Sequence, residues 1–249
     1  MKLDNFFAEN SKVALAFSGG VDSAFLLWAA KQYGAQVRAY YVKTAFQPQF
    51  EYEDALRLAK LLDADMVTLE VDVLQQEQIV SNPANRCYAC KRCLMRAIRE
   101  TAMKDGFSVL IDGTNASDDA SDRPGMRALR EESVRSPLRE CGLTKAQIRS
   151  LSKQAGLFTH DKPAYACLAT RIPMGTRITA GDLQRTERSE AYLRELGFTD
   201  FRIRLMGDCA KLQLTQREMP LLLQHRGRIV ERLRNDYAGI LLDMEVRDE

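Results

Sequence analysis

The chain has 249 residues, enough for one large domain or two smaller ones, and 45% of them are hydrophobic. Its 36 basic and 34 acidic residues nearly cancel, so the net charge does not indicate a nucleic-acid or anionic-membrane partner, although a local basic patch stays open. The N-terminal stretch lacks the apolar core of a signal peptide, and no apolar run is long enough to span a bilayer. We therefore expect a cytoplasmic protein, in which six cysteines suggest metal binding or catalysis before disulfides.

Short strand-like runs alternate with helical patterns through the first half of the chain. The predicted strands are residues 13–17, 37–42, 66–71 and 107–112, and the predicted helices are about 21–33, 51–63 and 87–104. Strands that alternate with helices are typical of βαβ units, and near-continuous apolar strands suit a sheet that is covered on both faces. The sequence therefore predicts an α/β fold with a parallel sheet flanked by helices.

The second half begins with loops and ends in a different pattern. Residues 113–137 and 158–177 are rich in turn-forming residues, and the helix predicted between them has Thr144 as its N-cap. The last part alternates helix, two strands, helix and strand, at 179–198, 201–206, 210–215, 216–235 and 238–243. This pattern predicts a small α+β domain. We expect two domains, residues 1–174 and 175–249.

The stretch Ser18-Gly19-Gly20-Val21-Asp22-Ser23 joins the first predicted strand to the first predicted helix. Two glycines let the backbone approach an anion closely, and the helix N-terminus adds N–H groups and a positive dipole end. The hydroxyls of Ser18 and Ser23 can donate to phosphate oxygens, whereas Asp22 beside an anion requires a bridging cation such as Mg²⁺. The stretch has neither the Gly-Lys-Ser/Thr ending of a Walker loop nor the dinucleotide pattern G-x-G-x-x-G. A plain strand–helix turn is the simpler alternative.

Three cysteines, Cys87, Cys90 and Cys93, are spaced C-x2-C-x2-C at a predicted helix start. Because residues three apart share a helix face, Cys87 and Cys90 can point at one metal centre, while Cys93 is rotated further. The spacing is similar to iron–sulfur ligation, and a structural zinc site would need a fourth ligand that neither His160 nor His225 supplies nearby. These thiols therefore need a partner from elsewhere, leave an open coordination position, or stay unligated.

A further thiol, Cys167, lies in a loop rich in functional residue types. Lys162 and Arg171 flank it and favour a thiolate, although a buried structural cysteine is the simpler alternative. Lys91 and Arg92 likewise follow Cys90 directly and would attract anions.

The stretch SGGVDS after a first strand resembles the PP-loop of ATP pyrophosphatases, which cleave ATP between the α- and β-phosphates and transfer AMP. Several further stretches resemble the LarE family, the ATP-dependent sulfur transferases of nickel-pincer nucleotide biosynthesis, and they run over nearly the whole chain. They are NPANRCYACK (82–91), DGTNASDD (112–119), RPGMRAL (123–129), SPLRECGLTKAQIR (136–149), DKPAYACLATRIP (161–173) and RELGFTDFRIR (194–204).

The resemblance implies ATP and Mg²⁺ as cofactors and adenylation of a carboxylate of pyridinium-3,5-biscarboxylic acid mononucleotide, with the pyrophosphate held by residues 18–23. Sulfur then displaces AMP and leaves a thiocarboxylate. Some members of the family use the sulfur of one cysteine, which becomes dehydroalanine, and this cysteine matches Cys167. Others hold a [4Fe–4S] cluster that presents a sulfide. The chain resembles the cluster type, with Cys87, Cys90 and Cys167 as ligands and Cys93 as a spare thiol or substitute ligand.

The resemblance also implies roles for other residues. Asp22 and Lys91 would act in catalysis beside Cys167, and Asn115 would bind the nucleotide with the turn. The implied substrate-binding residues are Lys91, Thr170, Arg171, Glu190, Arg202 and Arg204. One departure is Gln213, where the family pattern has an acidic residue, which puts a metal contact of the C-terminal domain in doubt. The family further implies a homo-oligomer, and the balanced charge and the lack of a long apolar run lead us to expect no nucleic-acid or membrane partner.

Three alternatives stay open at this point. A tRNA thiolation enzyme also uses a PP-loop and thiols, but the near-neutral charge and the lack of an RNA-binding extension disfavour it. A ligase of the NAD-synthetase kind would use ammonia and need no thiol. A nucleotide-binding module with structural zinc would bind ATP without releasing pyrophosphate.

Overall fold

The structure is a computed structural model that describes residues 2–118 and 124–247. The chain forms two compact units. The first unit comprises Met1–Val73 and Asn85–Ala164, and the second unit comprises Leu74–Ala84 and Tyr165–Glu249. Residues 119–123, which are part of the loop predicted at 113–137, lie outside the described residues.

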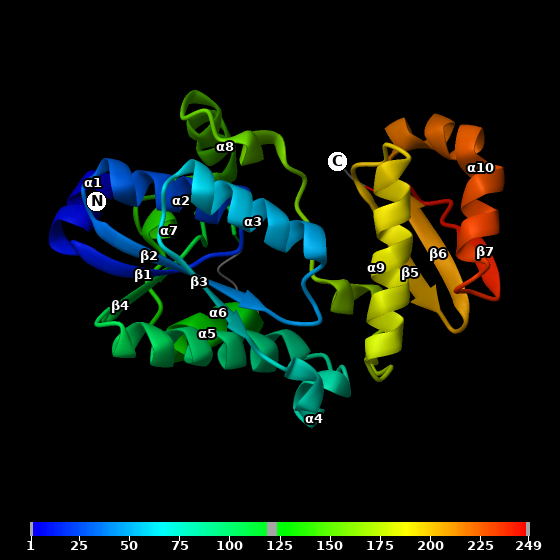
Figure 1. The fold of residues 1–249 in the computed structure, drawn as a ribbon, viewed down its shortest axis with the longest axis horizontal. Helices are drawn as coiled ribbons and strands as arrows, with labels where there is room; N and C mark the ends of the chain where they lie inside the picture. The colour runs from blue at the N-terminus through cyan, green and yellow to red at the C-terminus, as the bar shows by residue number, and fades with distance from the viewer. Residues whose placement is uncertain (1, 119–123, 248–249) are drawn as a thin grey trace. The chain divides into compact units, whose positions relative to one another are not determined.

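The first unit is built on a four-stranded parallel sheet with the order β3-β2-β1-β4 (Figure 1). Its strands are β1 (Lys12–Ala16), β2 (Gln36–Lys43), β3 (Met66–Glu70) and β4 (Val109–Asp112). Figure 1 shows α2 (Val21–Gln32) and α3 (Gln49–Leu61) on one face and α5 (Arg86–Lys104) and α6 (Pro124–Glu131) on the other. The predicted parallel α/β fold is therefore confirmed.

Successive residues of a strand face opposite sides, and this alternation builds two cores in the first unit. Val13 and Leu15 of β1 belong to the apolar cluster that α2 covers. Ala14, between them, belongs to a second cluster that contains Met95 and Ile98 of α5. Both faces of the sheet are covered, so the carboxyl ends of its strands form the open edge where a ligand can bind.

Several short helices complete the first unit, and the sequence predicted one of those named next, the helix that Thr144 caps. They are α1 (Leu3–Glu9), α7 (Pro137–Glu140), α8 (Lys145–Gln154) and the 3₁₀ helix η2 (Phe158–Asp161). The seven residues of α1 are too few to show a helical period, and α6 lies in a stretch whose Gly and Pro residues predicted a loop. The predicted cap of α8 is confirmed, because Thr144 and Gln147 form a reciprocal capping box.

The second unit has a three-stranded sheet of order β5-β6-β7 and two long helices. β5 (Phe201–Met206) pairs antiparallel with β6 (Cys209–Leu214), and β6 pairs parallel with β7 (Gly239–Leu242). The helices are α9 (Ala180–Glu195) and α10 (Met219–Leu233), with short segments α4 (Glu77–Val80), η3 (Leu168–Arg171) and η4 (Gln216–Glu218). The 3₁₀ helix η1 (Val73–Gln75) lies where the chain passes from the first unit to the second. The expected small α+β region is thus present, and α9 runs along one side of its sheet in Figure 1.

Residues 74–84 leave the first unit and pack in the second. The Asn82 side chain donates from Nδ2 to the carbonyl oxygen of Pro173 at 2.8 Å, and the Ile178 amide donates to the Val80 carbonyl at 2.7 Å. The predicted division at residues 174 and 175 does not include this excursion, because these hydrogen bonds join residues more than ninety positions apart and leave no local signal in the sequence.

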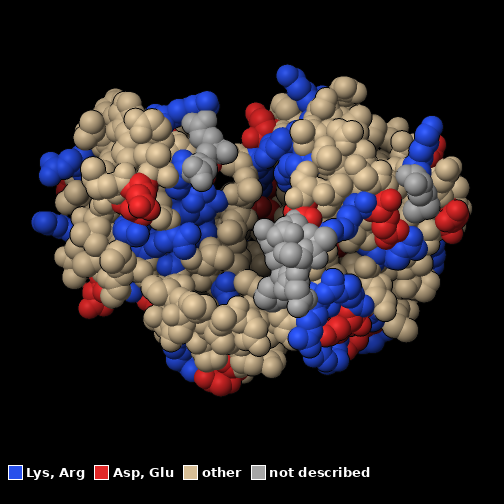
Figure 2. Space-filling view, turned by 180° about the vertical axis from the view of Figure 1, so that it is seen from behind, with Lys and Arg blue, Asp and Glu red and all other residues tan. Residues whose placement is uncertain are grey.

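On the face shown in Figure 2, Lys and Arg side chains stand in groups that are separated by neutral side chains and by Asp and Glu. This mixture agrees with the nearly equal numbers of basic and acidic residues. Among the described helices, none combines the length and the apolar character that crossing a membrane requires.

Candidate active site

The turn between β1 and α2 has the geometry of an anion-binding loop. Gly19 has φ of 71°, in the left-handed region that favours glycine. A Cβ added to Gly19 would lie 2.9 Å from the Cβ of Ala55 in α3, so the turn packs too closely against α3 for any side chain at residue 19. Ser18 is exposed, whereas Ser23 is buried and donates from its hydroxyl to the Gly20 carbonyl at 3.2 Å. The Ser23 hydroxyl therefore braces the turn, and the exposed Ser18 lies beside it, with its Oγ 3.1 Å from Oγ of Ser23.

Replacing Gly19 with alanine is expected to destabilise the first unit and to abolish nucleotide binding. The left-handed backbone costs alanine about 1–2 kcal/mol, and the collision with α3 adds about 1–3 kcal/mol. Gly34→Ala is the matched control, because Gly34 has φ of 75° and nothing within 4 Å of an added Cβ. Urea unfolding and ATP titration of both variants test this expectation, and equal losses of stability would contradict it.

Asp22, in the first turn of α2, is held by two side chains from distant parts of the chain. Its Oδ2 lies 2.5 Å from Nζ of Lys145, and its Oδ1 accepts from Nδ2 of Asn115 at 3.3 Å. Asn115 is buried and follows β4, while Lys145 begins α8. Asp22 is a partly exposed carboxylate beside a phosphate-type loop, the arrangement in which Mg²⁺ is usually bound together with phosphate oxygens, so the residues present fit that ion.

Sequence reasoning predicted Asn115 and Asp22 as neighbours of the nucleotide but missed Lys145. The residue lies inside SPLRECGLTKAQIR, one of the stretches that carry the family resemblance, directly after the N-cap Thr144. Nothing in its local pattern distinguishes it from an ordinary exposed lysine in a first helical turn. Only the fold reveals its contact with Asp22, across 123 residues of sequence.

Lys91 reaches the same edge of the sheet from α5. Its Nζ lies 3.9 Å from Oδ2 of Asp112, the last residue of β4. Asp112 is buried and also accepts hydrogen bonds from the hydroxyls of Thr114 and Ser136 at 2.6 and 2.7 Å. Within the first unit, the structure therefore brings Lys91 and the Asp22–Asn115 pair to the carboxyl edge of the sheet. Asp112, which sequence reasoning missed, holds Lys91, Thr114 and Ser136 together at this edge.

The three clustered thiols lie in the first half of α5. Cys87 is exposed, and Cys90 and Cys93 are partly buried. The buried Arg86 donates from Nη2 to Sγ of Cys87 at 3.4 Å, and its guanidinium lies over the ring of Phe46. Cys87 and Cys90 are three residues apart on one helix, as the shared-metal hypothesis requires.

Among the described residues, the six cysteines form no disulfide, and no three His, Cys, Asp or Glu side chains stand together as a metal site. Cys87 and Cys90 belong to the first unit and Cys167 to the second. Each unit by itself therefore contains only some of the predicted cluster ligands, and the [4Fe–4S] cluster stays a prediction.

A buried ion pair holds the segment that carries Cys167 in place. Nε of Arg171 lies 2.7 Å from Oε1 of Glu190, and these side chains are 1% and 0% exposed. Arg171 also donates from Nη1 to the carbonyl of Ala166 at 3.0 Å. Thr170 donates from its hydroxyl to the carbonyl of Cys167 at 2.8 Å. The residues on both sides of the thiol are therefore anchored to α9.

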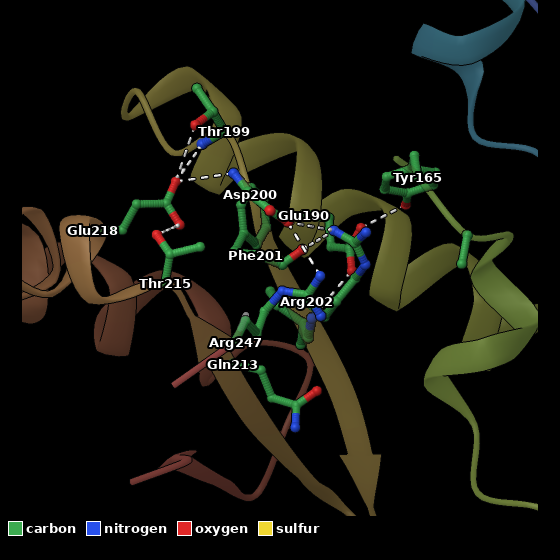
Figure 3. Close-up of polar contacts among 12 residues, drawn as sticks. Tyr165, Glu190, Thr199, Asp200, Phe201, Arg202, Gln213, Thr215, Glu218 and Arg247 are labelled. Carbon is green, nitrogen blue, oxygen red and sulfur yellow. Dashed lines mark hydrogen bonds and ion pairs between the residues drawn. The ribbon is translucent and has the colours of Figure 1, made fainter. Parts of the chain in front are cut away.

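Glu190 is the centre of this arrangement, and Figure 3 shows its side chain with the Tyr165 hydroxyl that donates to it. It accepts hydrogen bonds from Arg171, from the Tyr165 hydroxyl at 2.5 Å and from the Ile203 amide at 3.1 Å. Burial opposes its ionisation, but the hydrogen bonds and charge of Arg171, together with the hydrogen bonds from Tyr165 and Ile203, outweigh burial and lower the pKa of the carboxyl. Burial of the Tyr165 phenol beside this carboxylate raises its pKa. Arg171 and Glu190, predicted as substrate-binding residues, are thus buried and bonded to each other and to the Cys167 segment.

Arg202 and Arg204 of β5 lie close to this buried pair. Arg204 donates from Nη1 to the Thr170 carbonyl at 2.8 Å, which links β5 to the Cys167 segment. Burial, with the charges of Arg171 and Arg247, lowers the pKa of Arg202 to about 10, and the same causes lower the pKa of Arg204. The Arg202 guanidinium still carries its charge at neutral pH, and an anion bound beside both arginines would offset the repulsion that Arg171 and Arg247 exert on them.

Gln213, the departure from the family pattern, joins a basic and an acidic residue. Its Oε1 accepts from Nε of Arg204, and its Nε2 donates to Oδ2 of Asp243 at 2.7 Å. Asp243 directly follows β7 and also lies 2.7 Å from Nζ of Lys211, which helps to lower its pKa to about 2. The Gln213 amide therefore links the Arg204 guanidinium to the carboxylate of Asp243.

Comparison with known proteins gives the chain a family. A sequence model of the family described as thiamine biosynthesis protein (ThiI) matches residues 8–171, which is more than half of the chain. An uncharacterised protein of Synechocystis is 34% identical over 98% of this chain and 94% of its own length. A pyridinium-3,5-bisthiocarboxylic acid mononucleotide synthase of Lactiplantibacillus plantarum is 29% identical over 94% of this chain and 86% of its own length.

A tRNA-specific 2-thiouridylase of Pseudothermotoga lettingae is 25% identical over 61% of this chain and 54% of that protein. The Lactiplantibacillus relative, which matches almost the whole chain, confirms the resemblance to the LarE family that the sequence stretches indicated. The chain is therefore an enzyme that belongs to the ThiI family of PP-loop proteins, and within that family it resembles the LarE enzymes.

Proposed function

We propose that the chain is an ATP-dependent sulfur transferase that converts a carboxylate of pyridinium-3,5-biscarboxylic acid mononucleotide into a thiocarboxylate. The observation that carries the proposal is the Cys167 segment, anchored by the buried Arg171–Glu190 pair beside two further arginines of β5. This anchored thiol occurs in a chain that also has the anion-binding turn at residues 18–23. The product named for the Lactiplantibacillus relative supports the choice of substrate.

The first step would be activation of the carboxylate. The N–H groups at the start of α2 would bind the terminal phosphates of ATP, and Asp22 would hold Mg²⁺, which neutralises phosphate charge when bound. A carboxylate oxygen of the substrate attacks the α-phosphorus, and the bond from that phosphorus to the bridging oxygen breaks. Pyrophosphate leaves with the electron pair. The resulting acyl adenylate has a carbon that a sulfur nucleophile can attack.

The second step would use the thiol of Cys167. Its thiolate attacks the acyl carbon, a C–S bond forms, and AMP leaves with the electron pair of the broken C–O bond. Loss of the Cα proton of residue 167 and cleavage of its Cβ–S bond then release the thiocarboxylate and leave dehydroalanine. Arg202 and Arg204 would bind the phosphate of the mononucleotide, since paired guanidinium groups suit that anion.

A [4Fe–4S] cluster held by Cys87, Cys90 and Cys167 is the second sulfur source that we propose, and it would supply sulfide from outside the chain. In that case Cys167 keeps its own sulfur. The anchored backbone of the Cys167 segment would then orient a ligand, and the adenylation step stays the same.

Asp22→Ala is expected to lower pyrophosphate release by at least about 100-fold, because the variant removes the charged group that stabilises metal and phosphate in the turn. Pyrophosphate formed from ATP in the presence of the mononucleotide is the measurement. Asp4→Ala, which changes an exposed acid of α1, is the control and should retain wild-type release. Retained release in Asp22→Ala would refute the role of Asp22.

The cluster has its own test. After anaerobic reconstitution, the wild-type protein is expected to be brown and to contain about four irons per chain. Iron should fall sharply in Cys87→Ala, Cys90→Ala and Cys167→Ala, and it should be unchanged in Cys209→Ala, a partly buried thiol of β6. A colourless wild-type protein after reconstitution would rule out the cluster and leave Cys167 as the sulfur donor.

The match to a tRNA-specific 2-thiouridylase favours one other candidate, transfer of sulfur to tRNA. That match covers less of the chain than the match to the mononucleotide synthase. Binding of tRNA in modest salt, with sulfur appearing in the tRNA, would support this second candidate.

A further inference from the structure

The side chain of Lys162 binds two carboxylates of α3. Its Nζ lies 2.7 Å from Oδ2 of Asp54 and 3.1 Å from Oε2 of Glu51, and it also lies over the ring of Phe50. Lys162, Glu51 and Asp54 are 16%, 13% and 30% exposed, so water screens these ion pairs only in part. The ammonium group that the sequence pattern assigned to the Cys167 thiolate is therefore held by α3.

The backbone of Lys162 is held by a second helix. Arg149 of α8 donates from Nη1 to the carbonyl of His160 at 2.6 Å and from Nη2 to the carbonyl of Lys162 at 2.9 Å. Lys162 has φ of −56° and ψ of 125°, an extended conformation that a following proline favours, and Pro163 follows it. Contacts with α3 and α8 thus set the direction in which the chain leaves the first unit.

The helix that binds Lys162 also packs against the anion-binding turn. Ala55, next to Asp54 in α3, lies so close to Gly19 that a Cβ there would be only 2.9 Å from the Cβ of Ala55. One helix therefore touches both the turn at residues 18–23 and the start of the link to the second unit.

The far end of the link is fixed within the second unit. Ala164 is the last residue of the first unit, and Tyr165, the next residue, donates from its hydroxyl to Glu190 at 2.5 Å. Residue 167 is five positions beyond residue 162, and an extended chain spans at most about 18 Å over that length. The place of Lys162 therefore limits how far the thiol of Cys167 can lie from α3.

We propose that Lys162 is a positioning residue for sulfur transfer. Its ion pairs with Glu51 and Asp54 hold the start of the link to Cys167 against α3, so that the thiol is delivered to an acyl adenylate formed at the turn. The inference rests on the proposed function, and it applies whether the thiol gives its own sulfur or holds a cluster. Lys162 acts through the position of the link and takes no part in adenylation.

The test is an anaerobic single-turnover reaction with ATP, Mg²⁺, a sulfide source and the mononucleotide, in which pyrophosphate and thiocarboxylate are measured over time after rapid quenching. Lys162→Met removes both ion pairs and should slow thiocarboxylate formation about tenfold, because a small displacement of a reacting group is costly in rate. Pyrophosphate release should keep its wild-type rate. Lys162→Arg should restore transfer, and Lys153→Met, which changes an exposed lysine of α8, should behave as the wild type.

Neutralising the partners tests the same contact from the other side. Glu51→Gln/Asp54→Asn should slow transfer as Lys162→Met does, and adding Lys162→Met to that double variant should slow it no further. A purely stabilising role predicts a lower thermal midpoint with both steps slowed alike or with neither slowed, and either pattern would overturn the inference.

The wild-type reaction separates the two levels of the proposal. If the wild type transfers sulfur and Lys162→Met transfers it at an equal rate, only the inference about Lys162 fails. If the wild type releases no pyrophosphate or forms no thiocarboxylate, the proposed function fails and the inference fails with it.

Discussion

Glu190→Gln is expected to lower the free energy of unfolding by about 3–5 kcal/mol, the loss typical of removing one partner of a buried ion pair. The substitution leaves the guanidinium of Arg171 buried without a counter-charge, because both side chains are almost fully excluded from solvent. Tyr165 and the Ile203 amide donate to different oxygens of the carboxylate, so the single amide oxygen of Gln can accept from one of them and the loss reports the charge together with one hydrogen bond. Urea unfolding at neutral pH is the measurement.

The chain offers a matched control in the Glu77–Arg177 pair, whose side chains are 70% and 60% exposed. Glu77→Gln should change stability far less than Glu190→Gln does, because water screens this exposed pair. The double variant Arg171→Met/Glu190→Met should be more stable than Glu190→Gln, since no unpaired buried charge remains. A loss below about 1 kcal/mol for Glu190→Gln would contradict the importance of the Arg171–Glu190 pair for the stability of the fold.

The effect of Glu190→Gln should depend on pH. The folded-state pKa of Glu190 is lower than its ordinary value of 4.5, so its contribution is fully present above that value. The contribution is lost as the pH falls below 4.5 toward the folded-state pKa. The stability difference between the wild type and Glu190→Gln should therefore shrink in acid. A difference that stays constant through this range would mean that Glu190 does not titrate with folding.

Cys167→Ala is expected to reduce thiocarboxylate formation on the order of 1,000-fold or more, because both proposed sulfur sources use this thiol. Adenylation should survive, because the turn, Asp22 and Lys91 belong to the first unit and keep their contacts. We therefore expect a burst of about one pyrophosphate per chain and an accumulating acyl adenylate, both measured by mass spectrometry after quenching.

Cys209→Ala is the control for Cys167→Ala and should form product at the wild-type rate. Full product formation by Cys167→Ala would contradict the thiol's role, and amide formation from ammonia in that variant would favour a ligase of the NAD-synthetase kind. The intact mass of the wild-type chain identifies the sulfur source. Loss of the elements of H₂S after turnover shows that Cys167 gave its own sulfur, and an unchanged mass shows an external source.

The parts of the site that are local in sequence were predictable from it. The turn at residues 18–23 lies between an apolar run and a helical period, so its position at the end of β1 followed from the order of patterns. The Thr144 cap followed from one residue type at one offset from the helix. α6 was missed because its Gly and Pro residues predicted a loop, whereas packing of Leu129 in the core under α5 holds it helical.

The contacts that join distant residues were not predictable. The pairing of Lys145 with Asp22 depends on where α8 packs, and a lysine after an N-cap carries no sign of its partner. The family resemblance named Arg171 and Glu190 but could not show that they are buried, because burial depends on α9 and β5 closing over them. The link from Gln213 to Asp243 likewise appears only when β6 and β7 pair.

The most direct test of sulfur transfer is an anaerobic reaction of the wild-type chain with ATP, Mg²⁺, a sulfide source and pyridinium-3,5-biscarboxylic acid mononucleotide. We expect a product in which sulfur has replaced a carboxylate oxygen, formed together with equal amounts of AMP and pyrophosphate. Release of ADP and phosphate instead, or AMP and pyrophosphate with no sulfur in the mononucleotide from either the chain or the added sulfide, would contradict the proposed function.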